Sequence, residues 1–545
     1  MIRSLLAAGV AAAALSVPAI AAAQDTVANP PSGALKGSVE GGLKVFKGVP
    51  YAAAPVGPNR WKPPQPAPRW EGVRPATAFG AACIQPTRGQ PNLYTTDLGV
   101  TSEDCLTLNV WAPAKAEKAP VLVWIHGGAL VGGSSKEPLY DGAKLAGRGV
   151  VVVSINYRLG VFGWLAHPEL SAESAKGVSG NYGLLDQVEA LKWIQANIAA
   201  FGWDPANVTI SGESAGGLSV MYLMASPLAK GLFAKAIAQS AYMISTPELK
   251  TAAHGAPAAE QAGLALGAAL KASSIAALRD LPAQALSDAS AKAGFSPFGA
   301  VDGQVLPAQL IEVFDEGRQA PVPILAGFNS GEIRSLMILA PPEPASPAAY
   351  ETTIRQRYGD LADDFLRLYP KSDLRESILA TSRDALYGWT AERLARSQTT
   401  AGQAAYLYLF DHGYPAAETF NLHAFHASEL PYVFGNRDRT PPLWPRPPKT
   451  SDEAALSDAM LDYWTSFARD GRPTATKAPA WPAFTPGGAY VRFADKPRIE
   501  KNLMPGMFDL NEAVVCRRHA AGNLAWNWNV GLASPVLPAK AEGRP

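Results

Sequence analysis

One hexapeptide constrains the fold of this chain more than any other feature: Gly212-Glu213-Ser214-Ala215-Gly216-Gly217. It directly follows the β-branched run at residues 208–210 and precedes a helix-like apolar stretch that begins at Leu218. A G-x-S-x-G pattern between a strand and a helix is typical of a tight turn that holds the serine in a strained, exposed conformation. Glycine at the flanking positions avoids the clashes that a side chain would make there. The pattern therefore predicts a nucleophilic serine, Ser214, at the end of a strand.

The chain around this turn alternates segments of strand and helix character. Residues 121–125 (VLVWI) and 150–155 (VVVVSI) are short β-branched runs, which are typical of strands buried on both faces. Residues 184–198 (LLDQVEALKWIQANI) instead repeat their apolar positions every three to four residues, as a helix does. This alternation predicts an α/β fold with a large, mostly parallel, twisted central sheet and helices on both faces. The runs at 234–238 and 322–326 are expected to extend the sheet.

The rest of the mature chain is expected to belong to the same large domain, which we place at residues 24–545. Residues 248–286 are rich in alanine and have helical periodicity, and we interpret them as an insertion packed on the sheet. The Pro/Ser-rich stretches at 341–347 and 440–449 are predicted to be surface loops.

The first 23 residues have the composition of a secretory signal peptide. Arg3 gives a positive start, residues 5–17 are apolar, and residues 21–23 are three alanines before Gln24. The apolar run is shorter than the roughly 20 residues that a bilayer-spanning helix needs. We therefore expect export to the periplasm or the outside of the cell, without stable membrane insertion.

The overall composition argues against several classes of partner. The chain has 48% hydrophobic residues, 17% charged residues and a formal net charge of +1, so bulk electrostatics favour neither nucleic acid nor anionic membranes. Its three cysteines and seven histidines show no metal-ligand spacing. We expect no metal, no organic cofactor and a small-molecule substrate, and a chain that is a monomer or a weak homo-oligomer.

Export makes a disulfide possible among Cys83, Cys105 and Cys516. Three cysteines allow one bond and leave one thiol over. Cys83 and Cys105 enclose a segment rich in Gly, Pro, Thr and Asp with little periodicity, which a covalent bond would hold closed. We predict the bond between these two residues.

A serine nucleophile needs a histidine base and a carboxylate that orients it. In a fold with this serine turn the chain order is serine, acid, histidine, which excludes His126 and His167. His254 lies too close to Ser214 to leave room for an acid on a later strand. The sequence order therefore leaves four candidates open, and these are His412, His423, His426 and His519.

The developing negative charge of an acyl-transfer transition state also needs backbone N–H donors. His126-Gly127-Gly128-Ala129 follows the predicted strand at 121–125, which is the position of the HGGG-type turn in lipases and esterases. The segment is therefore a candidate oxyanion hole.

Several long stretches resemble the type-B carboxylesterases, the group of α/β-hydrolases that also contains the cholinesterases. The resemblance lies in residues 46–70 (FKGVPYAAAPVGPNRWKPPQPAPRW), 102–110 (SEDCLTLNV), 156–160 (NYRLG), 180–217 and 463–468 (YWTSFA). It covers nearly the whole mature chain, and it implies an α/β-hydrolase fold and hydrolysis of carboxylic esters.

The resemblance also implies roles for residues that the chain order left open. Residues 327–332 (GFNSGE) resemble the family segment that ends in the catalytic acid, which implies Glu332 and not its rival Asp302. Residues 426–435 (HASELPYVFG) resemble the segment that opens with the catalytic histidine, His426. The implied oxyanion donors are the N–H groups of Gly128, Ala129 and Ala215. The segment 103–105 (EDC) resembles the family's half-cystine motif and supports the bond of Cys105 to Cys83.

Two further residues and one departure complete the comparison. Ser240 resembles a residue that supports the acid through a hydrogen bond, and Glu213 would add negative potential beside the nucleophile. Ala129 stands where cholinesterases have a third glycine, so its methyl group narrows the space around the bound carbonyl. This puts hydrolysis of bulky tertiary-alcohol esters in doubt.

These features together predict a serine hydrolase that cleaves carboxylic esters through an acyl-enzyme with a Ser214–His426–Glu332 triad. A lipase for longer-chain acylglycerols is the nearest alternative, although no strongly apolar lid segment is evident. A non-catalytic binding module is the other alternative, although the chain has a serine, a glutamate and a histidine at the three triad positions.

Overall fold

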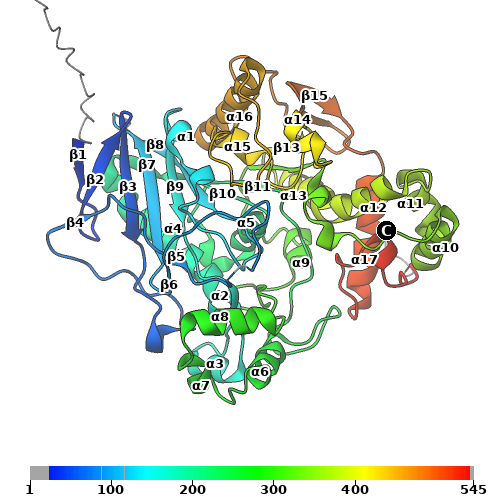
Figure 1. Cartoon of the computed structure of the whole chain (residues 1–545), viewed down its shortest axis with the longest axis horizontal. Helices are drawn as coiled ribbons and strands as arrows, with labels where there is room; N and C mark the ends of the chain where they lie inside the picture. The colour runs from blue at the N-terminus through cyan, green and yellow to red at the C-terminus, as the bar shows by residue number, and fades with distance from the viewer. Residues whose placement is uncertain (1–23, 88, 116, 541–545) are drawn as a thin grey trace, which may run out of the picture.

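The computed structural model describes residues 24–87, 89–115 and 117–540 (Figure 1). The predicted signal peptide, residues 1–23, lies outside the described residues.

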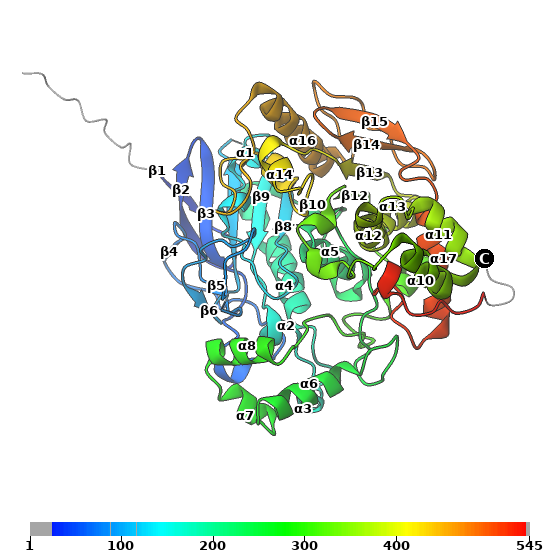
Figure 2. The same ribbon diagram turned by 45° about the vertical axis from the view of Figure 1, so that its right-hand side comes forward.

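A large twisted sheet runs through the molecule, as predicted (Figure 2). Its order is β1-β2-β3-β7-β9-β8-β10-β11-β12-β13-β14-β15, with β4 paired to β2. The strands from β9 to β14 in this order are parallel, whereas β1, β2, β3, β7 and β15 pair antiparallel at the two flanks. The sequence analysis did not predict these antiparallel flanks. The strand bounds are β1 Gln24–Ala28, β2 Ala34–Glu40, β3 Leu43–Pro50, β4 Val73–Pro75, β7 Thr107–Pro113, β8 Ala119–Ile125, β9 Val151–Ile155, β10 Trp203–Glu213, β11 Lys235–Gln239, β12 Ile324–Asn329, β13 Ala405–Phe410, β14 Ala489–Phe493 and β15 Pro497–Lys501.

The central strands are buried on both faces, which explains their unbroken apolar runs. In β8, Val121, Val123 and Ile125 face one hydrophobic core, and Leu122 and Trp124 face the other. Every residue of β8 is buried. The alternation of side chains along a strand thus divides one apolar run between two cores.

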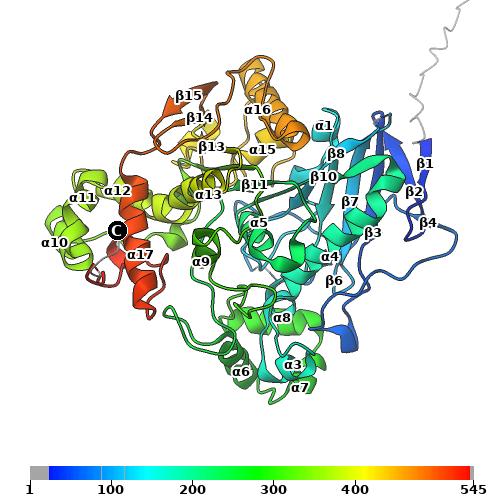
Figure 3. The same ribbon diagram turned by 180° about the vertical axis from the view of Figure 1, so that it is seen from behind.

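Helices cover the two faces. The first core receives apolar side chains of α4 (Tyr182–Asn197), α5 (Ala215–Ala225) and α13 (Trp389–Thr400), and Figure 3 shows α4 and α5 lying across the sheet. The second core receives those of α1 (Ala143–Ala146) and α16 (Ser451–Asp470). The predicted helix at 184–198 is therefore confirmed, with a start two residues earlier.

The alanine-rich insertion is helical only from residue 259, and it does not pack on the sheet as we expected. Its helices are α6 (Ala259–Ala269), α7 (Ile275–Arg279) and α8 (Ala283–Lys292). Their buried residues form a separate small core with α2 (Gly160–Trp164) and with Leu170 of α3 (Pro168–Glu173), at the bottom of Figure 1.

The remaining helices lie beyond β11 in the chain, many of them on the right of Figure 1. Their bounds are α9 Leu310–Asp315, α10 Pro347–Tyr358, α11 Ala362–Leu368, α12 Leu374–Arg383, α14 Pro415–Thr419, α15 Leu430–Val433 and α17 Met507–Ala521. Residues 341–346 and 440–449 have no helix or strand, which agrees with the predicted loops. Among the described residues, no helix is long and apolar enough to cross a membrane.

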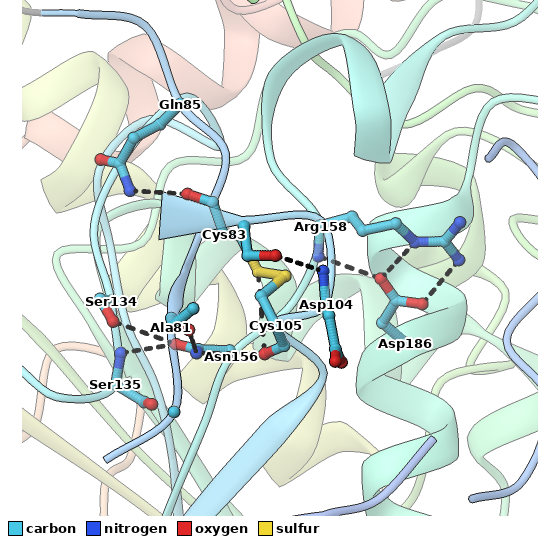
Figure 4. The surroundings of a disulfide bond; sticks show 12 residues. Ala81, Cys83, Gln85, Asp104, Cys105, Ser134, Ser135, Asn156, Arg158 and Asp186 are labelled. Carbon is cyan, nitrogen blue, oxygen red and sulfur yellow. Dashed lines mark hydrogen bonds and ion pairs between the residues drawn. A yellow bond between two sulfur atoms is a disulfide. The ribbon is translucent and has the colours of Figure 1, made fainter. Parts of the chain in front are cut away.

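A disulfide joins the predicted pair, Cys83 and Cys105, and closes a loop that carries the two short strands β5 (Ala82–Cys83) and β6 (Thr101–Ser102). Figure 4 shows that Asn156 fastens this loop to its surroundings. Its Nδ2 donates to the carbonyls of Ala81 (3.0 Å) and Cys105 (3.2 Å), and its Oδ1 accepts from the backbone N–H of Ser135 (2.9 Å). The loop is thus fixed covalently and by buried hydrogen bonds.

The disulfide is expected to stabilise the fold by restricting the unfolded chain. Replacing Cys83 and Cys105 together by alanine should lower the free energy of unfolding by about 3 kcal/mol, the value for closing a loop of this length. Denaturant unfolding measures the change. The exposed Cys516 is the matched control, and Cys516→Ala should leave the unfolding curve unchanged. Equal stability of the double variant and the parent would contradict this role.

Candidate active site

Ser214 lies at the turn between β10 and α5 in a strained backbone conformation, with φ 56° and ψ −120°. The turn is possible because Gly212 and Gly216, two residues before and two residues after Ser214, carry no Cβ. A Cβ on Gly216 would lie 2.1 Å from the carbonyl oxygen of Ile125 in β8, and one on Gly212 would lie 2.4 Å from the backbone of Gly216. The glycines therefore let the end of β10, the start of α5 and the end of β8 meet at the serine.

The segment after β8 forms the second part of the site. Gly128 has φ +105°, and its carbonyl accepts hydrogen bonds from the N–H groups of Val131 and Gly132, both at 3.0 Å. Ala129 follows in the left-handed region with φ 56°. Within the described part of the chain, no hydrogen bond uses the N–H groups of Gly128, Ala129 or Ala215. These donors are available to an oxyanion beside Ser214.

His126 supports this segment and does not take part in the predicted triad. Its ring stacks on Tyr157 at 4.6 Å between centroids, and its Nδ1 lies 2.9 Å from the carbonyl oxygen of Gly127. Burial lowers the pKa of His126 to about 4, so the ring is neutral at pH 7.

The structure brings His426 and Glu332 together from segments that are 94 residues apart. Glu332 follows β12 and is fully buried, and His426 lies in the loop between α14 and α15 that follows β13. The Nδ1 of His426 is hydrogen-bonded to one carboxylate oxygen of Glu332, and the other accepts from the backbone N–H of Asn329 at 2.8 Å. The second hydrogen bond fixes the carboxylate, and the first fixes the imidazole.

The other ring nitrogen of His426 faces Glu213. Its Nε2 lies 3.0 Å from Glu213 Oε1, and no hydrogen bond joins it to Ser214 among the described residues. Hydrogen bonds of catalytic groups are often formed fully only when substrate is bound. Glu213 therefore competes with Ser214 for the nitrogen that would act as the base.

The charges of these groups shift one another's pKa values. Burial alone would lower the pKa of His426, but the carboxylates of Glu213 and Glu332 outweigh it and raise that pKa above its usual range. Burial also raises the pKa of Glu213, while the charge of His426 opposes this rise. The imidazolium is thus stabilised by two neighbouring carboxylates.

A buried glutamate that the sequence analysis missed completes this cluster. Glu429 is fully buried and accepts hydrogen bonds from Gln239 Nε2 (3.0 Å) and Asn329 Nδ2 (2.7 Å). Trp464 Nε1 in turn donates to Gln239 Oε1 at 3.0 Å. Glu429 lies three residues after His426, and this spacing of an acid from the candidate base was the available signal.

Ser240 follows the buried β11 and has φ 43°. Its backbone N–H donates to the carbonyl of Gly327 at 2.8 Å, but its Oγ has no hydrogen-bond partner among the described residues. No hydrogen bond joins Ser240 Oγ to Glu332 in the described part of the chain, and the carboxylate of Glu332 is bonded by Asn329 and His426.

The other candidates have partners outside the site. His412 lies 3.1 Å from Glu453, His519 lies 3.1 Å from Glu312, and the two ring nitrogens of His423 face Asp411 (2.9 Å) and Glu418 (2.6 Å). Asp302 accepts the backbone N–H groups of residues 304–306 and forms a turn.

A cavity of about 390 Å³ opens above Ser214 at this edge of the sheet. Its lining is mainly apolar, and the described lining residues include Glu137 and Glu213 but no Lys or Arg. Phe298 and Tyr387 line the cavity, whereas Phe295 packs against the separate small core and Trp389 is buried in the first core. The aromatic residues of the lining are Tyr94, Tyr140, Tyr242, Phe298, Tyr387, Trp444 and Trp528.

The disulfide loop contributes to this cavity. It supplies Asn92 and Tyr94, and the Tyr94 hydroxyl donates to the carbonyl of His426 (3.1 Å) and bonds Ser335 Oγ (2.7 Å). Gln85 connects the loop to Gly133 through two hydrogen bonds, at 3.0 and 3.1 Å. Within the described ranges, no group of three or more His, Cys, Asp or Glu side chains is arranged to hold a metal ion.

Comparison with known proteins identifies the family. The model of the carboxylesterase family matches residues 24–509. The chain belongs to the carboxylesterase family.

Relatives and solved structures agree with this membership. The chain is 40% identical to the para-nitrobenzyl esterase of Bacillus subtilis over 459 residues, which cover 83% of this chain and 91% of that protein. It is 36% identical to the fumonisin B1 esterase of Sphingopyxis macrogoltabida over 503 residues, 89% of each chain. A solved PNB esterase has a TM-score of 0.77 at 36% identity and covers 89% of this chain and 99% of its own. This member of the carboxylesterase family is thus a carboxylic ester hydrolase with the α/β-hydrolase fold.

The contact between Glu213 and His426 predicts a change in the pH dependence of hydrolysis. Glu213→Gln removes a negative charge that stabilises the imidazolium, so the pKa of His426 should fall, and the acid limb of kcat/KM should move to lower pH by about one unit. A pH–rate profile with para-nitrophenyl acetate measures this shift. Glu392→Gln is the control, because Glu392 is buried outside the cavity. An acid limb that stays in place would contradict the assigned electrostatic role.

Proposed function

We propose that the chain hydrolyses neutral carboxylic esters by two-step acyl transfer, with Ser214 as nucleophile, His426 as base and Glu332 as the carboxylate that orients it. The observation that carries this proposal is the strained turn that presents Ser214 at the floor of an apolar cavity. His426, which is hydrogen-bonded to the buried Glu332, lines the same cavity and supports the assignment.

In the first step, His426 Nε2 takes the proton of Ser214, and Oγ attacks the ester carbonyl. The new oxyanion is held by the N–H groups of Gly128, Ala129 and Ala215, and His426 then protonates the departing alcohol. In the second step, water gives a proton to His426 and attacks the acyl-enzyme. The acyl–Oγ bond then breaks, His426 returns the proton to Ser214 Oγ, and the acid leaves.

The lining of the cavity supports neutral, apolar esters as the substrate class. A carboxylate on the substrate would lie near Glu213 and Glu137 without a Lys or Arg of the described lining to pair with it. The relative in Bacillus subtilis is named after para-nitrobenzyl esters. These esters are neutral and apolar, so they are suitable test substrates. We also propose that the chain is exported, on the composition of residues 1–23.

The serine assignment is tested by Ser214→Ala. This variant should lose at least about 10⁴-fold in kcat/KM for a short para-nitrophenyl ester, because no other group can form the acyl-enzyme. Circular dichroism should show an unchanged fold. Ser226→Ala is the matched control, since Ser226 is a buried serine at the other end of α5. Near-normal turnover by Ser214→Ala would refute the proposal.

The methyl group of Ala129 is expected to limit the bulk of the ester's alcohol group. Its methyl group lies at the oxyanion donors, so Ala129→Gly should raise hydrolysis of tert-butyl acetate by about tenfold relative to para-nitrophenyl acetate. Glycine also fits the backbone φ of 56° at this position without strain. The ratio of the two kcat/KM values is the measurement. An unchanged ratio would show that Ala129 does not limit the alcohol.

A further inference from the structure

The chain beyond α17 returns to the substrate cavity. The carboxylesterase model matches residues 24–509, yet Trp528 lines the cavity together with Tyr242 and Phe298. Trp528 therefore comes from a segment that the family model does not cover, whereas Tyr242 and Phe298 lie within the matched residues.

Buried side chains hold this segment in place. Asn527 is 1% exposed, and its Nδ2 donates to the carbonyls of Met243 (2.8 Å) and Ala385 (3.0 Å). Met243 follows Tyr242 and Ala385 precedes Leu386, and both of these neighbours line the cavity. Asn527 thus ties the segment directly to two other walls of the cavity.

A buried guanidinium fixes the backbone of Trp528, the residue after Asn527. Arg518 of α17 is fully buried, and its guanidinium donates to the carbonyls of Trp528 (2.9 Å) and Asn529 (3.4 Å) and to Ser534 Oγ. A buried charge is costly unless hydrogen bonds satisfy it, so moving this backbone would leave the guanidinium short of acceptors. The backbone of Trp528 is therefore held in place, and the half-buried residue lines the cavity.

We propose that Trp528 is the wall that limits the length of the acyl group, which is an extension of the function proposed above. The alcohol must leave beside His426, which protonates it, and Tyr94 lies at that end of the cavity, with its ring 6.4 Å from the imidazole and its hydroxyl bonded to the carbonyl of His426. Trp528 is anchored at another wall, because its neighbour Asn527 is bonded to the carbonyl of Met243, next to Tyr242 of the lining. Trp528, with its rigid anchor, therefore bounds the space for the acid portion of the ester.

The test is the acyl-chain profile of Trp528→Ala with para-nitrophenyl esters from acetate to decanoate. The ratio of kcat/KM for decanoate to that for acetate should rise by about tenfold, because the cavity lengthens on the acyl side. A series of acetates that differ in their alcohol should be hydrolysed with unchanged preference. Trp70→Ala is the control, since Trp70 is also a half-buried tryptophan packed on the same core but lies outside the cavity. An unchanged acyl profile, or a change confined to the alcohol series, would overturn the proposal.

Asn527→Ala tests whether the anchor acts through Trp528. It should shift the acyl ratio in the same direction through KM for the long esters, with kcat for acetate unchanged. Asn511→Ala is the matched control, because Asn511 is a buried asparagine of α17 that bonds a carbonyl in its own helix. A uniform loss of activity on all esters would reduce Asn527 to a structural role.

Titration with an organophosphonate keeps this test separate from the proposed function. If the parent is labelled stoichiometrically at Ser214 and the acyl ratio of Trp528→Ala does not move, the proposal for Trp528 fails alone. If Ser214 is not labelled, the nucleophile assignment fails whatever the acyl ratio shows.

Discussion

The site depends on the close approach of three backbone segments at Ser214. The end of β8, the end of β10 and the start of α5 meet at distances that leave no room for a Cβ on Gly212 or Gly216. A non-glycine residue at φ 56° and ψ −120° costs on the order of 1–3 kcal/mol, so the packed sheet must hold it there. The same packing brings the segment after β8, with its N–H donors, beside the serine. The strained turn at Ser214 and the position of the N–H donors beside it are thus two results of one backbone contact.

The second constraint is electrostatic. Glu213, Glu332 and Glu429 are all buried within one cluster around His426. Each carboxylate is costly to bury, and the hydrogen bonds from Asn329 and Gln239 offset part of that cost. The resulting negative field favours the protonated form of His426. The buried polar side chains of Asn329 and Gln239 near the histidine donate hydrogen bonds to Glu429.

The sequence predicted those parts of the structure that depend on local patterns. The unbroken apolar runs at β8 and β9 indicated buried parallel strands, and G-x-S-x-G indicated the turn at Ser214. Chain order alone left four histidines open, and the choice of His426 came from family resemblance. Contacts between distant segments had no local signal: Asn527 bonds Met243 and Ala385, which lie 284 and 142 residues away. The insertion at 248–286 was placed wrongly for the same reason, because periodicity predicts a helix but not the surface it packs on.

We propose that Ser214 attacks an ester whose oxyanion is then held by Gly128, Ala129 and Ala215. A crystal structure of the protein after reaction with a para-nitrophenyl phosphonate tests this claim most directly. We expect a phosphonyl group on Ser214 Oγ, with its oxygen within about 3 Å of the three backbone nitrogens and His426 Nε2 turned from Glu213 toward Oγ. An adduct on another residue, or a phosphonyl oxygen directed away from these donors, would contradict it.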